Sequence, residues 1–223
     1  MKKTICLIFL FIGILGVSLQ LFLIRKKSQS SPVATQVHSG PLQTQGVDPD
    51  GKFTRYSKVP SFSLLERSGQ QVTLDSMRGK VWIADFVFTN CPDICPLLNS
   101  RIVGIQKELL ASGENVAIVS FSVDPANDTP EVLRGYADHL GADPRWLFMT
   151  GDKAQLQKIA MEGFLMAFSN EEGMAPADVS HSSKIALVDQ NGIVRRFYEG
   201  VSRDESAKIV ADVKTLLEEG GRP

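Results

Sequence analysis

The sequence contains very little cysteine and histidine, with three residues of each in 223. Three cysteines are too few for a scaffold held together by disulfides, which small secreted domains use because their cores are small. The hydrophobic content of 43% is enough for one globular domain with a core of its own and a modest additional segment. The few cysteines therefore either have a chemical role or occur by chance.

The chain also lacks an excess of charge of either sign. Lysine and arginine total 24, aspartate and glutamate total 25, and the formal net charge at pH 7 is -1. The two signs alternate along the chain, and the sequence has no basic stripe of the kind that contacts the phosphates of nucleic acid. We therefore expect no nucleic acid among the partners of this protein.

One long run near the start has no charged residue. Residues 4–24, TICLIFLFIGILGVSLQLFLI, contain a single strongly polar side chain, Gln20. A helix of this length, rising about 1.5 Å per residue, matches the ~30 Å hydrocarbon core of a bilayer. The alternative is a cleaved signal peptide, but its apolar region is usually only about 7 to 15 residues long. We predict a single-pass membrane anchor over residues 1–27. Lysine and arginine residues flank the apolar run on both sides, so the distribution of positive charge does not decide the orientation of the anchor.

Residues 28–58 are rich in Ser, Gln, Thr, Pro and Gly and contain little that could form a core. This composition is typical of a flexible tether, and we interpret His38 within it as a solvated side chain. The folded domain is expected to occupy residues 59–223.

Strand and helix patterns alternate within this domain. The apolar run over residues 81–88 predicts a strand that is buried on both faces of a sheet. The other expected elements are bounded by turn or capping signals. They are a hairpin around Ser68-Gly69, a helix over 95–113, a strand over 116–123, a helix with Asp128 or Thr129 as N-cap, a strand over 147–150, a helix over 151–164, a hairpin around Asn191-Gly192 and a helix over 203–219. This order predicts an α/β fold with helices on both faces of the sheet.

Two of the three cysteines lie four positions apart in the segment FVFTNCPDICP, residues 86–96. Positions i and i+4 share one face of a helix, so the sulfurs of Cys91 and Cys95 can touch or share a ligand. The segment joins a predicted buried strand to a helix, where unpaired backbone N–H groups and the macrodipole favour a thiolate. The pair is suited either to reversible disulfide formation or to binding a soft metal ion. The third cysteine, Cys6, lies in the apolar run and is assigned no function.

A metal site would need a further ligand. Two thiolates suit copper(I), and one imidazole completes a trigonal set, whereas structural zinc takes four protein ligands. His139 falls within a predicted helix, where a histidine that faces solvent is the ordinary case. His181 lies in a loop before a predicted strand, a position where the sites of α/β sheets gather. From the residues alone, His181 is either a ligand or a solvated loop residue.

Three motifs, FVFTNCPDICP, FSVDPANDTP and SHSSKIALVDQNG, resemble in order and spacing the Sco/SenC family of membrane-anchored copper proteins, which assist cytochrome c oxidase assembly. The resemblance covers about residues 59–219. It implies a thioredoxin-like fold, with a central mixed sheet flanked by helices, in which copper is held by Cys91, Cys95 and His181. It also implies that Asp124 supports the site, although an aspartate at this position is equally typical of a turn.

Two residues depart from the expected pattern. Many members of the family have histidine where this chain has Asn90, a position that is not one of the three ligands. Asp85 lies within the predicted buried strand, where a carboxyl group must be paired, protonated or close to the opening of the site.

The resemblance implies a copper chaperone without turnover of its own, loaded by an upstream copper donor, that delivers copper to the binuclear copper centre of an oxidase subunit. The alternative is an enzyme, a thiol-disulfide oxidoreductase that uses Cys91 and Cys95 to reduce the cysteines of the oxidase copper site. A thiol peroxidase would have a Pro-x-x-x-Thr pattern before its cysteine. The run DFVFTN, which directly precedes Cys91, has no proline, so we do not expect a peroxidase. The chaperone and the oxidoreductase both imply a domain on the extracytoplasmic, periplasmic side of the membrane, with Met1 inside.

Overall fold

The structure, a computed structural model, describes residues 46–47, 52–90, 95–166 and 183–220. The chain forms two units, Met1–Gly40 and Pro41–Pro223, and only the second contains described residues. The predicted anchor over 1–27 and most of the predicted tether lie outside them. Within the described ranges, no helix is long and apolar enough to cross a membrane.

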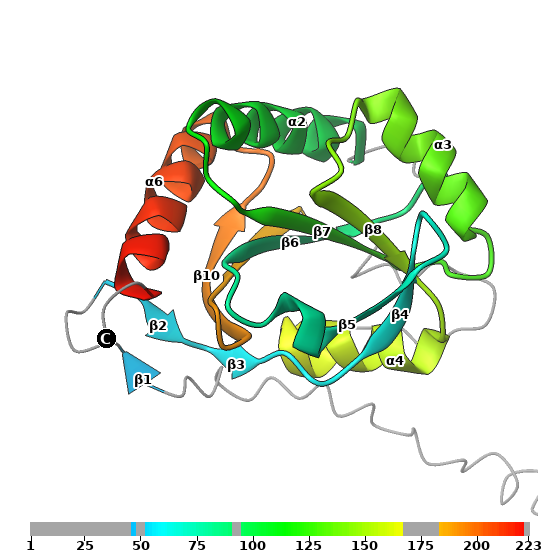
Figure 1. Cartoon of the computed structure of the whole chain (residues 1–223), viewed down its shortest axis with the longest axis horizontal. Coiled ribbons are helices and arrows are strands. Elements are labelled where there is room, and N and C mark those ends of the chain that lie inside the picture. Colours follow the sequence, from blue (N-terminus) through cyan, green and yellow to red (C-terminus); the bar gives the residue numbers. More distant parts are fainter. Residues whose placement is uncertain (1–45, 48–51, 91–94, 167–182, 221–223) are drawn as a thin grey trace, which may run out of the picture. The chain divides into compact units, whose positions relative to one another are not determined.

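A mixed eight-stranded sheet forms the centre of the domain (Figure 1). Across the sheet, the strands are β3 (Ser57–Lys58), β10 (Ile193–Glu199), β9 (Lys184–Val188), β6 (Trp82–Val87), β7 (Ala117–Ser122), β8 (Trp146–Thr150), β4 (Ser63–Glu66) and β5 (Gln71–Thr73). The pairs β6–β7 and β7–β8 are parallel, and the other pairs are antiparallel. A separate small sheet pairs β1 (Gly46–Val47) with β2 (Thr54–Arg55).

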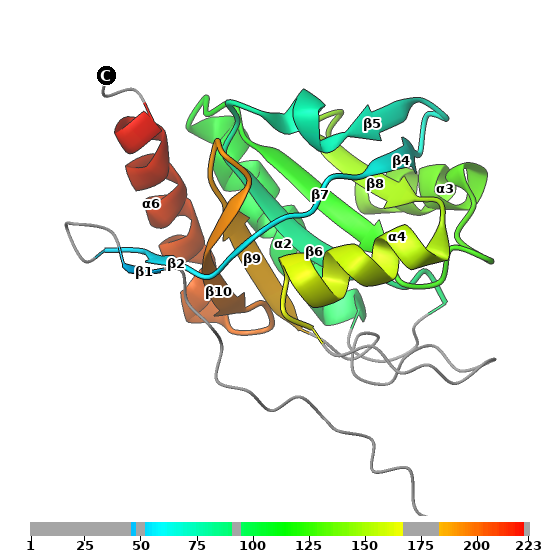
Figure 2. The ribbon, with the colours of Figure 1, turned by 90° about the horizontal axis from the view of Figure 1, so that it is seen from below.

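Helices cover both faces of this sheet (Figures 1 and 2). One face carries α2 (Cys95–Ala111), α3 (Pro130–Leu140) and α6 (Arg203–Gly220). The other face carries α4 (Lys153–Lys158), the π-helical turn Ile159–Gly163 that continues it, and the 3-10 turn Leu74–Met77. The predicted central mixed sheet flanked by helices is thus confirmed, and the helix expected over 151–164 changes from α to π geometry after Lys158.

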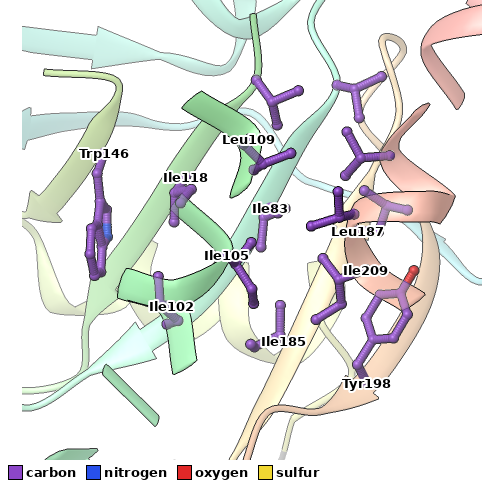
Figure 3. Packing of buried hydrophobic residues seen from close by; sticks show 14 of the residues in the cluster. Ile83, Ile102, Ile105, Leu109, Ile118, Trp146, Ile185, Leu187, Tyr198 and Ile209 are labelled. Atoms are coloured by element: carbon purple, nitrogen blue, oxygen red, sulfur yellow. The ribbon is translucent and has the colours of Figure 1, made fainter. Parts of the chain in front are cut away.

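Packing beneath α2 sets the position of this helix. Its apolar residues recur every three or four positions, so they form one face of the helix. The apolar residues that face the sheet are buried, among them Ile102, Ile105 and Leu109 (Figure 3). Ile102 and Ile105 pack in one cluster with Ile83 of β6 and Ile118 of β7. Because Cys95 is the first residue of α2, the same packing determines where that backbone position lies.

The opposite face of the sheet is filled by aromatic side chains. Phe86 lies in edge contact with Phe164, with ring centroids 5.5 Å apart, and Phe121 lies 5.8 Å from both Phe62 and Phe164. Every residue of β6 is therefore buried, with Ile83 facing one core and Phe86 the other. The prediction of a strand covered on both faces is confirmed.

The turn and capping signals are also confirmed. The hairpin between β9 and β10 turns at Asn191-Gly192, and Gly192 has a positive φ of 76°, which side chains disfavour. Of the two candidate N-caps for α3, Thr129 is the cap, because its side chain accepts a hydrogen bond from the N–H of Val132.

The predicted start of the domain at residue 59 is wrong. Phe53 is buried in the main core, where the guanidinium groups of Arg195 and Arg196 lie over its ring, and β3 pairs with β10. The composition of residues 28–58 hides this contribution because Phe53 is a single apolar residue among polar neighbours. The folded domain includes at least residues 53–58.

Candidate functional site

The structure describes only part of the predicted ligand set. Cys91 and His181 lie outside the described residues, and Cys95 is the first residue of α2. His139 lies in the last turn of α3 and is exposed, as predicted for a helical histidine that faces solvent. In the described part of the chain, no three or more His, Cys, Asp or Glu side chains are grouped so as to hold a metal ion.

The strand register brings three chain segments to one edge of the sheet. β6 and β7 are parallel, and the N–H of Val123 donates to the carbonyl of Val87, so both strands end together. β9 runs antiparallel to β6 with Ala186 opposite Ala84, so β9 begins at this same edge. The described residues that lead into Cys91 and those that begin at Ser183, two positions after His181, therefore lie at the same edge.

A close contact joins α2 to the start of β9. Gly200 donates its N–H to the carbonyl of Ser183 at 2.7 Å. A Cβ atom at Gly200 would lie 2.4 Å from Leu98 Cδ1 of α2 and 2.5 Å from the carbonyl oxygen of Ser183. Only glycine allows this approach, which holds the first turns of α2 against the strand that follows His181.

A buried carboxylate ties the end of β6 to the segment after β7. Asp128 is fully buried, and its two oxygens accept hydrogen bonds from two hydroxyl groups. Thr89 Oγ1 donates to Oδ1 at 2.5 Å, and Ser122 Oγ donates to Oδ2 at 2.6 Å. Thr89 lies two residues before Cys91 in the sequence.

Burial dominates the electrostatics of Asp128. Removal of the carboxyl group from water raises its pKa above the ordinary value, and the hydrogen bonds from Ser122 and Thr89 oppose this effect. The charge of Asp124 raises the pKa further. The hydroxyl donors are therefore what allows a carboxylate to remain at this buried position.

Asp124 forms the turn that precedes α3. Its carbonyl oxygen accepts from the N–H groups of Asn127 and Asp128, and its carboxylate accepts from Asn127 Nδ2 at 2.7 Å. The side chain is half-buried at the same sheet edge. The turn role is thus present, and support of the site by Asp124 stays a prediction.

The partner that the sequence does not name for Asp85 is Ser120. The two residues are opposite each other in the β6–β7 register, and Ser120 Oγ donates to Asp85 Oδ1 at 2.5 Å. Ser120 Oγ in turn accepts from Trp146 Nε1 at 2.8 Å. The other oxygen of Asp85 has no hydrogen-bond partner among the described residues. Burial raises the pKa of Asp85 to about 7, and the Ser120 hydrogen bond opposes the rise.

The sequence reasoning missed three residues of this arrangement, Thr89, Ser122 and Ser120, and considered Asp128 only as a helix cap. A usable signal is present: all three hydroxyl residues lie within or just after otherwise apolar strand patterns. A hydroxyl group on a buried strand needs a partner, and a nearby buried carboxylate is one that it can donate to.

One hollow of about 290 Å³ lies away from this edge. It is lined by both apolar and polar residues, among them Trp82 at the start of β6 and Asn191 in the β9–β10 turn. It is therefore at the opposite end of β6 from the cysteine segment and does not belong to the predicted site.

Known proteins match this chain over most of the described domain. A family model described as SCO1/SenC matches residues 51–218. The SCO1 protein homolog of Bacillus subtilis (strain 168) is 37% identical over 161 residues, which cover 71% of this chain and 82% of that protein.

Solved structures have the same fold. BsSco, a member of the Sco family of cytochrome c oxidase assembly proteins with a disulfide switch, superposes with a TM-score of 0.65 at 35% identity, over 72% of this chain and 94% of BsSco. Arabidopsis thaliana ScoI with copper bound superposes with a TM-score of 0.59 at 26% identity, over 73% of this chain and 99% of ScoI. The chain belongs to the SCO1/SenC family.

Proposed function

We propose that this protein binds copper through Cys91, Cys95 and His181 and delivers it to the binuclear copper centre of cytochrome c oxidase during assembly. The observation that supports this proposal most directly is the strand register. The end of β6 and the start of β9 meet at one sheet edge, so the chain segments next to Cys91 and His181 are neighbours there. Cys95 begins the helix that packs over the same sheet.

The chemistry of the proposed donor set fits copper as a cargo. Thiolates are soft ligands, and the pair with one imidazole completes a three-coordinate set for copper(I). A site with three ligands is also open to a partner's cysteines, so copper can pass to the oxidase subunit by exchange of one ligand at a time. The described segments that precede Cys91 and follow His181 meet at one edge of the sheet, which supports such access.

The relatives support both halves of the proposal. A family member has been solved with copper bound, and BsSco is described as a cytochrome c oxidase assembly protein. The predicted anchor over residues 1–27 would hold the copper domain at the membrane. With Met1 on the cytoplasmic side, the domain would lie on the periplasmic side. An upstream donor would load the protein there.

Removal of the histidine tests the ligand set. Full-length protein in detergent is loaded with copper under anaerobic conditions, desalted, and assayed for copper per chain and for thiolate-to-copper charge-transfer absorption. We expect wild type to retain copper and His181→Ala to lose most of it. The control is His139→Ala, because His139 is exposed on α3. Equal retention by wild type and His181→Ala would reject the ligand assignment.

A second candidate function uses the same two cysteines. The disulfide switch of BsSco favours a thiol-disulfide oxidoreductase that reduces the cysteines of the oxidase copper site. A disulfide-exchange assay on an oxidised peptide from such a site separates the two functions. Reduction that persists in His181→Ala and is lost in Cys91→Ser supports the oxidoreductase, whereas copper delivery requires all three residues.

A further inference from the structure

We propose that Asp128 is a positioning residue for the cysteine pair. Its carboxylate holds Thr89, and with it the end of the strand segment that leads into Cys91, against the segment that follows β7. The inference deepens the proposed copper function, on which its metal readout rests. Its second readout, the disulfide equilibrium of Cys91 and Cys95, needs no metal.

The bonding pattern uses both oxygens of the Asp128 carboxyl group. Both hydroxyl groups donate to Asp128, one to each oxygen, so both oxygens act as acceptors. An amide at this position has one acceptor oxygen and an NH₂ donor, so it keeps both contacts only if one hydroxyl turns to accept, and the charge assistance is lost from both. Charge-assisted hydrogen bonds of this length are stronger than neutral ones. The carboxylate therefore fixes Thr89 and Ser122 at the same time.

Helix capping does not explain this residue. The N-cap of α3 is Thr129, whose own hydroxyl accepts from Val132, so the side chain of Asp128 is not needed there. The carboxylate bonds instead to residues outside α3, one of them 39 positions away in the sequence. Its bonding is directed to the two strand ends at the edge where the cysteine segment starts.

Asp189 is a matched buried carboxylate elsewhere in the fold. It is 2% exposed, accepts from the N–H groups of Asn191 and Ile193, and pairs with Arg195. It closes the β9–β10 turn, at the opposite end of β6 from the cysteines. The same substitution at the two positions therefore separates loss of buried hydrogen bonds in general from loss of cysteine positioning.

The metal readout compares copper affinity in the full-length protein. We expect Asp128→Asn and Thr89→Val to lower the affinity for copper by about 10- to 100-fold, the range found when residues that support metal ligands are removed. Thr89→Ser keeps the hydroxyl and is expected to restore the wild-type value. Asp189→Asn is expected to stay within about twofold, because distant sites act independently.

The metal-free readout is the equilibrium with glutathione in a Cys6→Ser background, which leaves only Cys91 and Cys95. In this reaction, the two thiols give two electrons and two protons to oxidised glutathione, forming the protein disulfide and two reduced glutathione molecules. A loosened segment brings the two sulfurs together less often. We expect Asp128→Asn and Thr89→Val to lower the equilibrium constant for disulfide formation by about tenfold, and Asp189→Asn to leave it unchanged.

The outcomes distinguish this inference from the proposed function. If wild type binds no copper but Asp128→Asn lowers the disulfide equilibrium, the copper proposal fails and the positioning role stands. If wild type binds copper, and Asp128→Asn and Thr89→Val match it in copper affinity and in the disulfide equilibrium, the positioning role is refuted and Asp128 has only a structural role. Equal losses in Asp189→Asn would likewise overturn the inference. Should Asp128→Asn fail to fold, Thr89→Val and Ser122→Ala give the same comparison.

Discussion

At the scale of single residues, the unusual group is Asp85. A carboxyl group on a strand that is buried on both faces lowers the free energy of unfolding when it is ionised, because the charge has lost its hydration in the core. The hydroxyl of Ser120 satisfies one oxygen and is itself held by Trp146, which leaves the other oxygen without a partner in the described part of the chain. The protonated form of Asp85 is therefore favoured up to about pH 7, which is the pKa of this side chain in the folded protein.

The stability of the protein should depend on pH through this residue. Burial raises the pKa of Asp85 from 3.8 to about 7, so between these values the folded state holds a proton that the unfolded state has lost. The stabilising contribution is complete below about pH 4, falls as pH rises, and is gone above about pH 7. The whole change is at most about 4 kcal/mol.

Replacement of Asp85 by asparagine should remove this dependence. We expect Asp85→Asn to be more stable than wild type at pH 8 by about 2 to 4 kcal/mol and closer to it at pH 4, as measured by urea unfolding across this range. Other carboxyl groups titrate in both proteins, so the difference between the two curves carries the result. Parallel curves would show that Asp85 does not hold a proton in the folded state.

At the scale of secondary structure elements, α2 and β9 are the two elements next to the proposed ligands. Leu98 of α2 is 2% exposed and packs with Ile185 of β9 in the main core. Gly200 fits between them because it has no side chain, and its N–H donates to Ser183. The distance between the cysteine helix and the histidine strand is therefore set by a backbone contact.

Gly200→Ala tests this contact. The added methyl group must displace the carbonyl of Ser183 or the side chain of Leu98, and we expect a loss of about 1 to 3 kcal/mol in the free energy of unfolding. Copper affinity should fall as well, because the strand after His181 moves away from α2.

The control is Gly104→Ala on α2, where a new Cβ atom meets nothing within 4 Å. Alanine in a helix interior should stabilise the protein by about 0.5 to 1 kcal/mol and leave copper affinity unchanged. The spacing argument is refuted if Gly200→Ala unfolds and binds copper as wild type does.

At the scale of the whole molecule, the chain consists of the units Met1–Gly40 and Pro41–Pro223, and the described sheet and both cores belong to the second. The first includes the predicted anchor over residues 1–27. A copper carrier that serves a membrane oxidase gains from such an anchor because it stays close to its partner, which raises the effective concentration.

Deletion of residues 1–40 should therefore release the protein from the membrane. We expect the full-length chain to stay in the membrane fraction after an alkaline wash, because a span of about 20 apolar residues is anchored by its burial in the hydrocarbon core. The shortened chain should appear in the soluble fraction with its copper affinity unchanged. Release of the full-length chain by the wash would contradict the anchor and favour a cleaved signal peptide.

Prediction from sequence succeeded where the signal is local. The buried strand, the cap Thr129 and the Asn191-Gly192 turn each follow from a few adjacent residues. It failed at Phe53, because one apolar residue in a polar segment has no periodicity. It left Asp85 without a partner because Ser120 lies 35 positions away and becomes a neighbour only in the parallel register.

The sequence by itself determined the α/β order of elements, the start of a helix at Cys95, and the resemblance that identifies the family. These features depend on neighbours along the chain, whose spacing is set by the covalent backbone. Only the tertiary structure decided that Asp128 bonds to Thr89 and Ser122, and that Gly200 separates α2 from β9. Such contacts depend on strand order and on the packing of helices against the sheet, because they join segments that are distant in sequence.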